Sequence, residues 1–241
     1  MKELKKFFEK LWDGVFPSST CFNCGEELVD KNLSLCEECK KKFVFTNKIC
    51  NKCGSPIESD TACSICKHKS RFFEVARAPL VYEGEVKDII WKFKYKNRTD
   101  LARYLAKFLE LEFLKNIELF GKVDVIVPVP LHKNKLALRG YNQSMLLAKE
   151  LSNLVHVDLD KESLVRVKNT ETQTYLDFQQ RQENMKDAFA LTTGNLKGKN
   201  VLLVDDVFTT GATVDSSAKT LIDGGAKSVL ILTVATTIVE K

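Results

Sequence analysis

Three strongly apolar runs in the C-terminal part of this 241-residue chain constrain its fold more than any other feature. They are "VDVIVPVP" at 123–130, "NVLLVDDV" at 200–207 and "SVLILTVAT" at 228–236. Strands of a parallel sheet are covered on both faces, so they are apolar almost throughout instead of alternating with polar residues. Helical patterns separate the three runs. The sequence therefore predicts an α/β fold, a parallel sheet flanked by helices.

The segments between these runs have apolar residues three or four positions apart, which indicates helices. We expect helices at 85–96, 100–116, 141–155 and 213–225, and a further strand at 75–82. The residues between 130 and 141 are predicted to form a polar loop. Crossovers between the parallel strands should be right-handed.

Composition limits the class of protein without identifying it. Hydrophobic residues make up 44% of the chain and charged residues 29%. The chain has no apolar run near the roughly 18 residues that a membrane-spanning helix needs. The net charge of +5 is compatible with phosphate-bearing ligands or nucleic acid, but it requires neither. We expect a soluble, cytoplasmic protein without a transmembrane segment.

The N-terminal stretch 1–17 is predicted to be a basic amphipathic helix. Glu9, Lys10 and Asp13 interrupt its apolar residues, so it does not resemble a signal peptide. Such a helix either docks on its own domain or makes a peripheral contact with a membrane surface or a partner.

All eight cysteines lie between residues 21 and 66, in four C-x-x-C pairs. The pairs are Cys21 with Cys24, Cys36 with Cys39, Cys50 with Cys53, and Cys63 with Cys66. Two C-x-x-C pairs supply the four thiolates of a tetrahedral zinc site. Disulfides are the alternative, but thiols stay reduced in the cytoplasm. We therefore expect two structural Zn²⁺ ions, with no open coordination position for catalysis.

The spacing leaves the pairing of the four knuckles open between a consecutive and a cross-braced arrangement. Gly25 and Gly54 directly follow the second cysteine of the first and third pairs, which favours a doubled unit with consecutive pairing. The expected organisation is a helix at 1–17, a double zinc ribbon at 18–70 and an α/β domain at 71–241.

A candidate ligand site follows the second apolar run, in "VLLVDDVFTTGATV" at 201–214. Ligands of open parallel sheets bind beyond the carboxyl ends of the strands, where Asp205 and Asp206 are placed. The threonines and the glycine that follow open a helix, whose amides can bind a phosphate. The stretch lacks the lysine of a nucleotide triphosphatase loop. A sugar phosphate fits the pattern, with its phosphate in the loop and its hydroxyls on the acids.

This stretch resembles the phosphoribosyl pyrophosphate (PRPP) signature of type I phosphoribosyltransferases. The resemblance implies that Asp205 and Asp206 hold the ribose hydroxyls and that the loop holds the 5-phosphate. The loop residues are Thr209, Thr210, Gly211, Ala212 and Thr213. Two more stretches match: 127–144 looks like a pyrophosphate loop with Arg139 as its cation, and 166–191, with Lys168 and Arg181, is placed like the mobile loop that closes over PRPP. Arg139, Lys168 and Arg181 are the candidate catalytic residues.

Together, the cysteine-rich N-terminus, the "RGYNQ" and "QT-x-L-x4-R-x2-N-x3-AF" patterns and the PRPP motif resemble the competence protein F (ComF/ComFC) family. That resemblance implies PRPP and Mg²⁺ binding, a role in DNA uptake during natural transformation, and transfer of a phosphoribosyl group to an acceptor that the sequence does not reveal. The alternative is a non-catalytic, PRPP-sensing factor that binds single-stranded DNA or DNA-uptake proteins. Tyr141 departs from the family pattern, in which phenylalanine is expected.

Four other residues receive modest interpretations. Lys94 and Tyr95 could reach a phosphate, but we expect them on a solvated helix face, and we expect Trp91 in the core. His132 is placed near the pocket mouth, without an assigned role.

Overall fold

The computed structural model describes residues 20–28, 35–58, 61–169, 187–192 and 196–238. The helix expected at 1–17 lies outside these ranges. The chain divides into two compact units, Met1–Phe43 and Val44–Lys241, which are described separately below. Within the described ranges, no helix is long and apolar enough to span a membrane.

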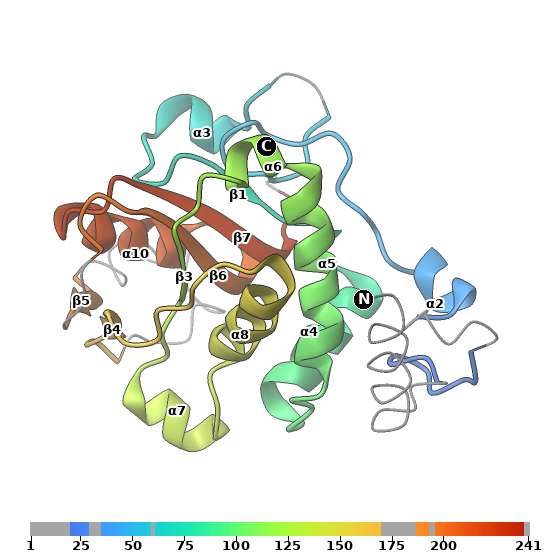
Figure 1. The fold of residues 1–241 in the computed structure, drawn as a ribbon. Helices are drawn as coiled ribbons and strands as arrows, with labels where there is room; N and C mark the ends of the chain where they lie inside the picture. The colour runs from blue at the N-terminus through green and yellow to red at the C-terminus, as the bar shows by residue number, and fades with distance from the viewer. Residues whose placement is uncertain (1–19, 29–34, 59–60, 170–186, 193–195, 239–241) are drawn as a thin grey trace, which may run out of the picture. The chain divides into compact units, whose positions relative to one another are not determined.

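The larger unit contains a five-stranded sheet whose strand pairs are all parallel (Figure 1). The strands are β1 (Ala76–Arg77), β2 (Leu80–Val81), β3 (Val125–Pro128), β6 (Asn200–Phe208) and β7 (Ser228–Thr236). β7 pairs with β1 and β2 on one side and with β6 on the other, and β3 pairs with the far side of β6. The predicted α/β class is confirmed.

The strand expected at 75–82 is divided between β1 and β2. Two carbonyl groups of the intervening residues turn to Thr46: its hydroxyl donates to the oxygen of Ala78 at 2.7 Å, and its amide donates to that of Pro79 at 3.0 Å. Because proline has no amide proton, Pro79 cannot donate to the sheet, and the ladder is interrupted there.

Helices flank the sheet in the larger unit (Figure 1). The described helices of this unit are α3 (Ser64–His68), α4 (Gly84–Tyr95), α5 (Leu101–Lys115), α6 (Ile117–Phe120), α7 (Lys133–Arg139), α8 (Gln143–Val155) and α10 (Ala212–Asp223), of which α5, α8 and α10 pack on the long strands. Four of them match the expected helices to within two residues at each end. α7 lies where a polar loop was expected, because His132 caps it: its Nδ1 accepts a hydrogen bond from the Asn134 amide at 3.3 Å.

Alternate residues of the central strands face two different layers, because side chains point to opposite faces along a strand. Val201 and Leu203 pack in one buried cluster with α10 and with three cysteines of the second group. Leu202 and Val204 point to the opposite face, where α8 packs on β3 and β6 and α5 packs on β7. Coverage of both faces explains why these strands are apolar throughout.

A short antiparallel pair, β4 (Leu164–Arg166) and β5 (Phe189–Leu191), bounds the stretch predicted to be a mobile loop. Residues 170–186 of that stretch lie outside the described ranges. The pair places the side chain of Arg166 beside the site described below.

The two cysteine groups fall in different units. In the smaller unit, Cys36 caps α2 (Glu37–Lys41), and Cys21, Leu28 and Cys39 form a small buried cluster. The second group lies in the larger unit, where Cys50, Cys53 and Cys63 are buried in the same core cluster as residues of β6 and β7, and Cys66 packs partly buried against it. The compact division therefore falls after Phe43, within the stretch 18–70 expected to form one domain, because the second group packs against the sheet.

Candidate functional site

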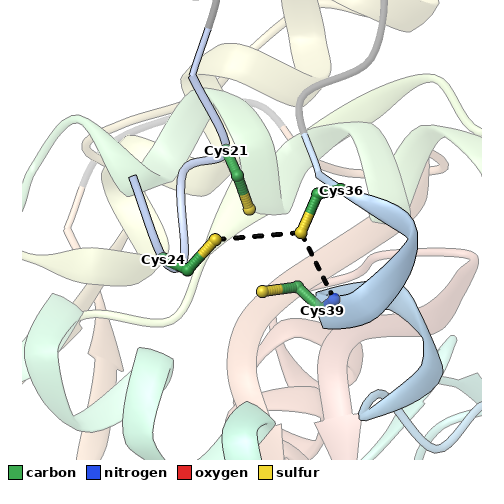
Figure 2. Close-up of side chains that lie close together, drawn as sticks. All are labelled: Cys21, Cys24, Cys36 and Cys39. Carbon is green, nitrogen blue, oxygen red and sulfur yellow. Dashed lines mark hydrogen bonds between the residues drawn. The ribbon is translucent and has the colours of Figure 1, made fainter. Parts of the chain in front are cut away.

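The cysteines form two groups of four in which all sulfur atoms lie within 4.8 Å of one another. In Figure 2, Cys21, Cys24, Cys36 and Cys39 point their sulfurs toward a common centre. The Cys24–Cys36 sulfur distance is 3.7 Å and the Cys53–Cys63 distance 3.6 Å, both far too long for a disulfide bond. A tetrahedron with Zn–S bonds of about 2.3 Å has edges of about 3.8 Å, so the cysteines fit Zn²⁺. Consecutive pairing is confirmed.

The two cysteine groups repeat the same local structure, as the doubled unit predicts. The amide of Gly25 donates to the carbonyl of Cys21 at 2.8 Å, and that of Gly54 donates to the carbonyl of Cys50 at 2.9 Å. Both glycines have positive φ, +80° and +72°, as the tight turn after each first knuckle requires. In each half a one-turn helix begins directly after the third cysteine.

A cavity of about 210 Å³ opens at the carboxyl end of β6, where the sequence places the acids and the loop. Its lining residues come from the residue that follows β2, from α4, from the segment after β3, from α7 and α8, from β4, and from β6 with the start of α10. Polar and charged lining residues are Tyr82, Lys94, Lys135, Arg139, Gln143, Ser144, Arg166, Asp205, Asp206, Thr209 and Thr213.

Asp205 and Asp206 both line this cavity, and each has a different partner. The Ser144 hydroxyl donates to Asp205 Oδ1 at 2.7 Å, and the Lys94 ammonium lies 2.7 Å from Asp206 Oδ1. Burial and the adjacent Asp206 carboxylate raise the pKa of Asp205 to about 7, although the Ser144 hydrogen bond and the Lys94 charge oppose this. Burial alone would lower the pKa of Lys94, but the two carboxylates outweigh burial and raise it.

The motif "RGYNQS" at 139–144 builds the wall facing these acids. Arg139 ends α7, and its Nη1 donates to Oε1 of the fully buried Gln143 at 2.7 Å. Asn142 caps α8 by accepting from the Ser144 amide at 3.1 Å, and its own amide group donates to the Val129 carbonyl. Each side chain thus fixes the loop that presents Arg139 and Ser144 to the cavity.

Tyr141, which departs from the family pattern, has a partner for its additional hydroxyl. This hydroxyl donates to the carbonyl of Phe93, and the two rings lie 6.2 Å apart. The contact joins the start of α8 to α4, the helix that carries Lys94. The departure therefore leaves the geometry of the site intact.

Three cations form a second wall of the cavity. Lys135 and Arg139 come from α7, and Arg166 comes from β4. Burial, followed by the charges of Arg166 and Arg139, lowers the pKa of Lys135. Positive groups that repel one another in this way are arranged to receive a polyanion.

The loop between β6 and α10 has the geometry of an anion site. Gly211 caps α10 with φ +76°, and Phe208 fills the space beside it, so that an added Cβ would lie 2.6 Å from the ring. Only glycine fits this position without strain. The first amides of a helix have no acceptor within the helix, and they point out of its N-terminus. Thr209 and Thr213 line the cavity next to these amides.

The structure brings most of the expected site residues together. Asp205, Asp206, Thr209, Gly211, Ala212, Thr213 and Arg139 line one cavity. Thr210 does not line the cavity. Its hydroxyl accepts from the Ala212 amide at 3.4 Å, and its carbonyl accepts from Arg71 Nη2 at 2.9 Å. Lys168 is exposed and does not line the cavity either. Arg181 lies outside the described residues.

The structure corrects the predictions made from the sequence for Lys94, Trp91 and His132. Lys94 is not on a solvated face: its side chain is 20% exposed and is paired with Asp206. Trp91 is not a core residue, since it is 47% exposed. His132 is buried and caps α7, away from the cavity lining. The sequence reading also missed Ser144, which contacts Asp205.

Comparison with known families agrees with this architecture. Residues 11–67 match the double zinc ribbon domain, and residues 105–240 match the phosphoribosyl transferase domain. The second match covers more than half of the chain. The chain is thus a phosphoribosyl transferase-domain protein with an N-terminal double zinc ribbon, and the paired cysteine groups support structural zinc.

Similar proteins show to which family of phosphoribosyl transferase-domain proteins the chain belongs. The DNA utilization protein YhgH of Escherichia coli K12 is 32% identical over 88% of this chain and 94% of its own length. Competence protein F of Haemophilus influenzae is 30% identical with the same coverage. The chain belongs to the competence protein F family. Among solved structures, a purine phosphoribosyltransferase from Pyrococcus horikoshii matches with 18% identity and a TM-score of 0.35, over 57% of this chain and 85% of that one.

Proposed function

We propose that the cavity binds PRPP together with Mg²⁺. The observation that carries this proposal is the division of a single cavity into an acidic wall, a cationic wall and a helix N-terminus. A phosphorylated pentose with a pyrophosphate group has one part for each. The ribose hydroxyls would donate to Asp205 and Asp206, and the 5-phosphate would accept from the loop 209–213.

The pyrophosphate group would lie against Lys135, Arg139 and Arg166. Mg²⁺, held by the oxygens of PRPP itself, would neutralise part of its charge. Lys168 and Arg181, the other two candidate catalytic residues, would approach the bound PRPP with the loop that follows β4, and this loop would exclude water from the ribose.

In the enzymatic form of the proposal, the bond between ribose C1 and the pyrophosphate oxygen breaks, and the pyrophosphate leaves with the electron pair. The acceptor then forms a bond to C1. Arg139 and its neighbours would stabilise the charge that develops on the leaving group. The names of the relatives support a role for the chain in DNA uptake or DNA utilization, within which this reaction or this binding would occur.

Calorimetric titration with PRPP and Mg²⁺ tests the proposal. We expect saturable binding, lost in Asp206→Asn because a neutral amide accepts hydrogen bonds from the ribose more weakly than a carboxylate does. Asp223→Asn is the matched control, since Asp223 is exposed at the opposite end of α10 and pairs with Lys219. Absence of PRPP binding by the wild type contradicts the proposal. Pyrophosphate release in the presence of candidate acceptors separates catalysis from sensing.

A second candidate function, binding of single-stranded DNA, is favoured by an aromatic pair on α4. Trp91 and Tyr95 are 47% and 58% exposed, and their ring centroids lie 6.2 Å apart. Lys96 lies 5.1 Å from the Trp91 ring and Arg139 lies 4.8 Å from the Tyr95 ring. Exposed rings flanked by cations suit stacked bases and a phosphate backbone. Arg139 also lines the cavity, so a bound strand would pass the cavity mouth.

Fluorescence anisotropy with a labelled oligothymidine tests this candidate. Trp91→Ala should weaken binding by about 1–3 kcal/mol if one base stacks there, and the affinity should fall as salt rises. Leu138→Ala is the control, because Leu138 is 89% exposed and lies on neighbouring α7. Equal binding by the wild type and Trp91→Ala contradicts a site on α4. Loss of binding only after zinc removal would place the site on the ribbons instead.

A further inference from the structure

A buried arginine connects the second zinc ribbon to the phosphate loop. Arg71 follows Cys66, the last cysteine of the second group, by five residues, and its side chain is 1% exposed. Its Nη2 donates to the carbonyl of Thr210 at 2.9 Å. Its Nη1 lies 3.6 Å from Oδ2 of Asp215, in the first turn of α10. One guanidinium therefore contacts both sides of the turn that opens α10.

Asp215 completes this connection from the side of the helix. Its residue is 8% exposed, and its Oδ1 accepts a hydrogen bond from the amide of Phe72 at 2.8 Å. Its own amide donates to the carbonyl of Gly211 at 2.8 Å. Both carboxylate oxygens thus face the segment that leaves the ribbon, while the backbone of Asp215 closes the first turn of the helix.

A second route runs through aromatic rings. Phe73 is 1% exposed and packs edge to face against Phe208, with ring centroids 6.1 Å apart. The Phe208 ring in turn fills the space beside Gly211. Close-packed rings transmit a displacement, because interiors have few voids to absorb it. Movement of Phe73 would therefore move the loop through Phe208.

The other end of this segment is held by the ribbon and the sheet. The amide of Ala76 donates to the carbonyl of Lys52 at 2.8 Å, and Lys52 lies between Cys50 and Cys53 in the first knuckle. The amide of Glu74 donates to the carbonyl of Val229 in β7 at 2.8 Å. The position of the segment is thus defined by the knuckle that the metal closes.

We propose that Arg71 is a positioning residue through which the second zinc ribbon sets the geometry of the phosphate loop. This inference rests on the proposed function, since it assigns the loop to the 5-phosphate. Arg71 does not line the cavity: it acts by fixing the Thr210 carbonyl and, through Asp215, the first turn of α10. Zinc in the second site and a 5-phosphate in the loop then favour the same arrangement. By thermodynamic linkage each strengthens the binding of the other.

The test compares two probes that use different parts of the cavity. Ribose 5-phosphate needs the loop, whereas Mg²⁺-pyrophosphate needs only the cationic wall. We expect Arg71→Gln to bind ribose 5-phosphate about tenfold more weakly than the wild type while pyrophosphate affinity stays within twofold. Arg77→Gln is the matched control: Arg77 bonds to the Asn51 carbonyl of the same knuckle but does not contact the loop, and it should bind both probes normally.

The zinc affinity of a protein that retains Arg71 tests the same connection independently of whether Arg71→Gln folds. In full-length Cys24→Ser, in which only the second cysteine group is complete, zinc affinity is measured by competition with a chromogenic chelator. Ribose 5-phosphate at saturation should raise this zinc affinity several-fold, and pyrophosphate should not. If ribose 5-phosphate leaves the zinc affinity unchanged, the connection does not operate.

The possible results distinguish a failure of the proposed PRPP binding from a failure of the connection through Arg71. Failure of the wild type to bind either probe overturns the proposed function, and this inference with it. Normal ribose 5-phosphate binding by folded Arg71→Gln overturns the inference alone. Equal loss of both probes also overturns it, since that result indicates general damage to the cavity. Selective loss of ribose 5-phosphate binding supports it.

Discussion

The pH dependence of folding provides a direct test of how Asp205 is held. Asp205 has a pKa of about 7 in the folded protein and 3.8 as its unperturbed value. Between these values the folded state binds the proton and the unfolded state does not, so the free energy of unfolding falls as pH rises. The full shift corresponds to about 2.7 kcal/mol between pH 5 and pH 8. Because Asp205 is only half-buried and faces an open cavity, we expect about 1–2 kcal/mol.

Urea unfolding of the wild type and of Asp205→Asn at pH 5 and pH 8 measures this effect. The amide retains the size of the side chain and can still accept from Ser144, but it does not titrate. Titrating groups that do not interact with Asp205, including the zinc-site thiols, contribute equally to both proteins and cancel in the difference. The wild type should lose about 1–2 kcal/mol more than the variant as pH rises. Parallel pH profiles would refute the assignment of a raised pKa to Asp205.

Three further predictions concern the cavity and the zinc sites. Lys94→Met leaves the Asp206 carboxylate without its Lys94 partner and should lower the free energy of unfolding by about 2 kcal/mol. This loss is smaller than the roughly 3–5 kcal/mol expected for a fully buried pair, because the Lys94 side chain is 20% exposed. A loss under about 0.5 kcal/mol in urea unfolding would contradict the pairing. Gly211→Ala should cost about 2–4 kcal/mol from positive φ and from overlap with Phe208. Gly198→Ala, with φ +74° and no atom of the described residues beyond its chain neighbours within 4 Å of the added Cβ, should cost only the backbone strain of about 1 kcal/mol. Native mass spectrometry should find two zinc ions per chain, and their chelation should reduce the ordered structure seen by circular dichroism; a single ion would contradict the doubled unit.

The parts of the site that could be predicted from the sequence are those set by local spacing. The two-residue gap within each knuckle predicted the zinc sites, because both sulfurs of a knuckle must reach one ion. The glycines after the first and third knuckles, Gly25 and Gly54, predicted the consecutive pairing. Asp205 and the loop beginning at Thr209 follow a buried strand directly, and the carboxyl end of a parallel strand is where ligands bind. In each case the residues that act together are neighbours in the chain.

The parts that were missed depend on contacts between distant elements. Ser144 reaches Asp205 only because α8 packs beside β6, and Arg166 enters the cavity through the antiparallel pairing of β4 with β5. Neither contact has a signal in local periodicity. Trp91 is different, since its exposure could have been predicted. The buried residues of α4 are Val86, Ile89, Ile90 and Phe93, a stripe at helical spacing that does not include position 91.

The two halves of the cysteine-rich region share the same glycine turn, but the space around the glycine differs between them. Gly25 and Gly54 occupy equivalent turns and both have positive φ, so backbone conformation favours glycine at each. Apart from its chain neighbours, no atom of the described residues lies within 4 Å of the position that a Cβ on Gly25 would occupy, whereas a Cβ on Gly54 would lie 2.5 Å from the carbonyl oxygen of Ala76 in β1. The second ribbon therefore requires glycine for close packing as well as for the turn. This added requirement follows from its place in the core of the larger unit, where a zinc site and a sheet edge have to be built as one structure.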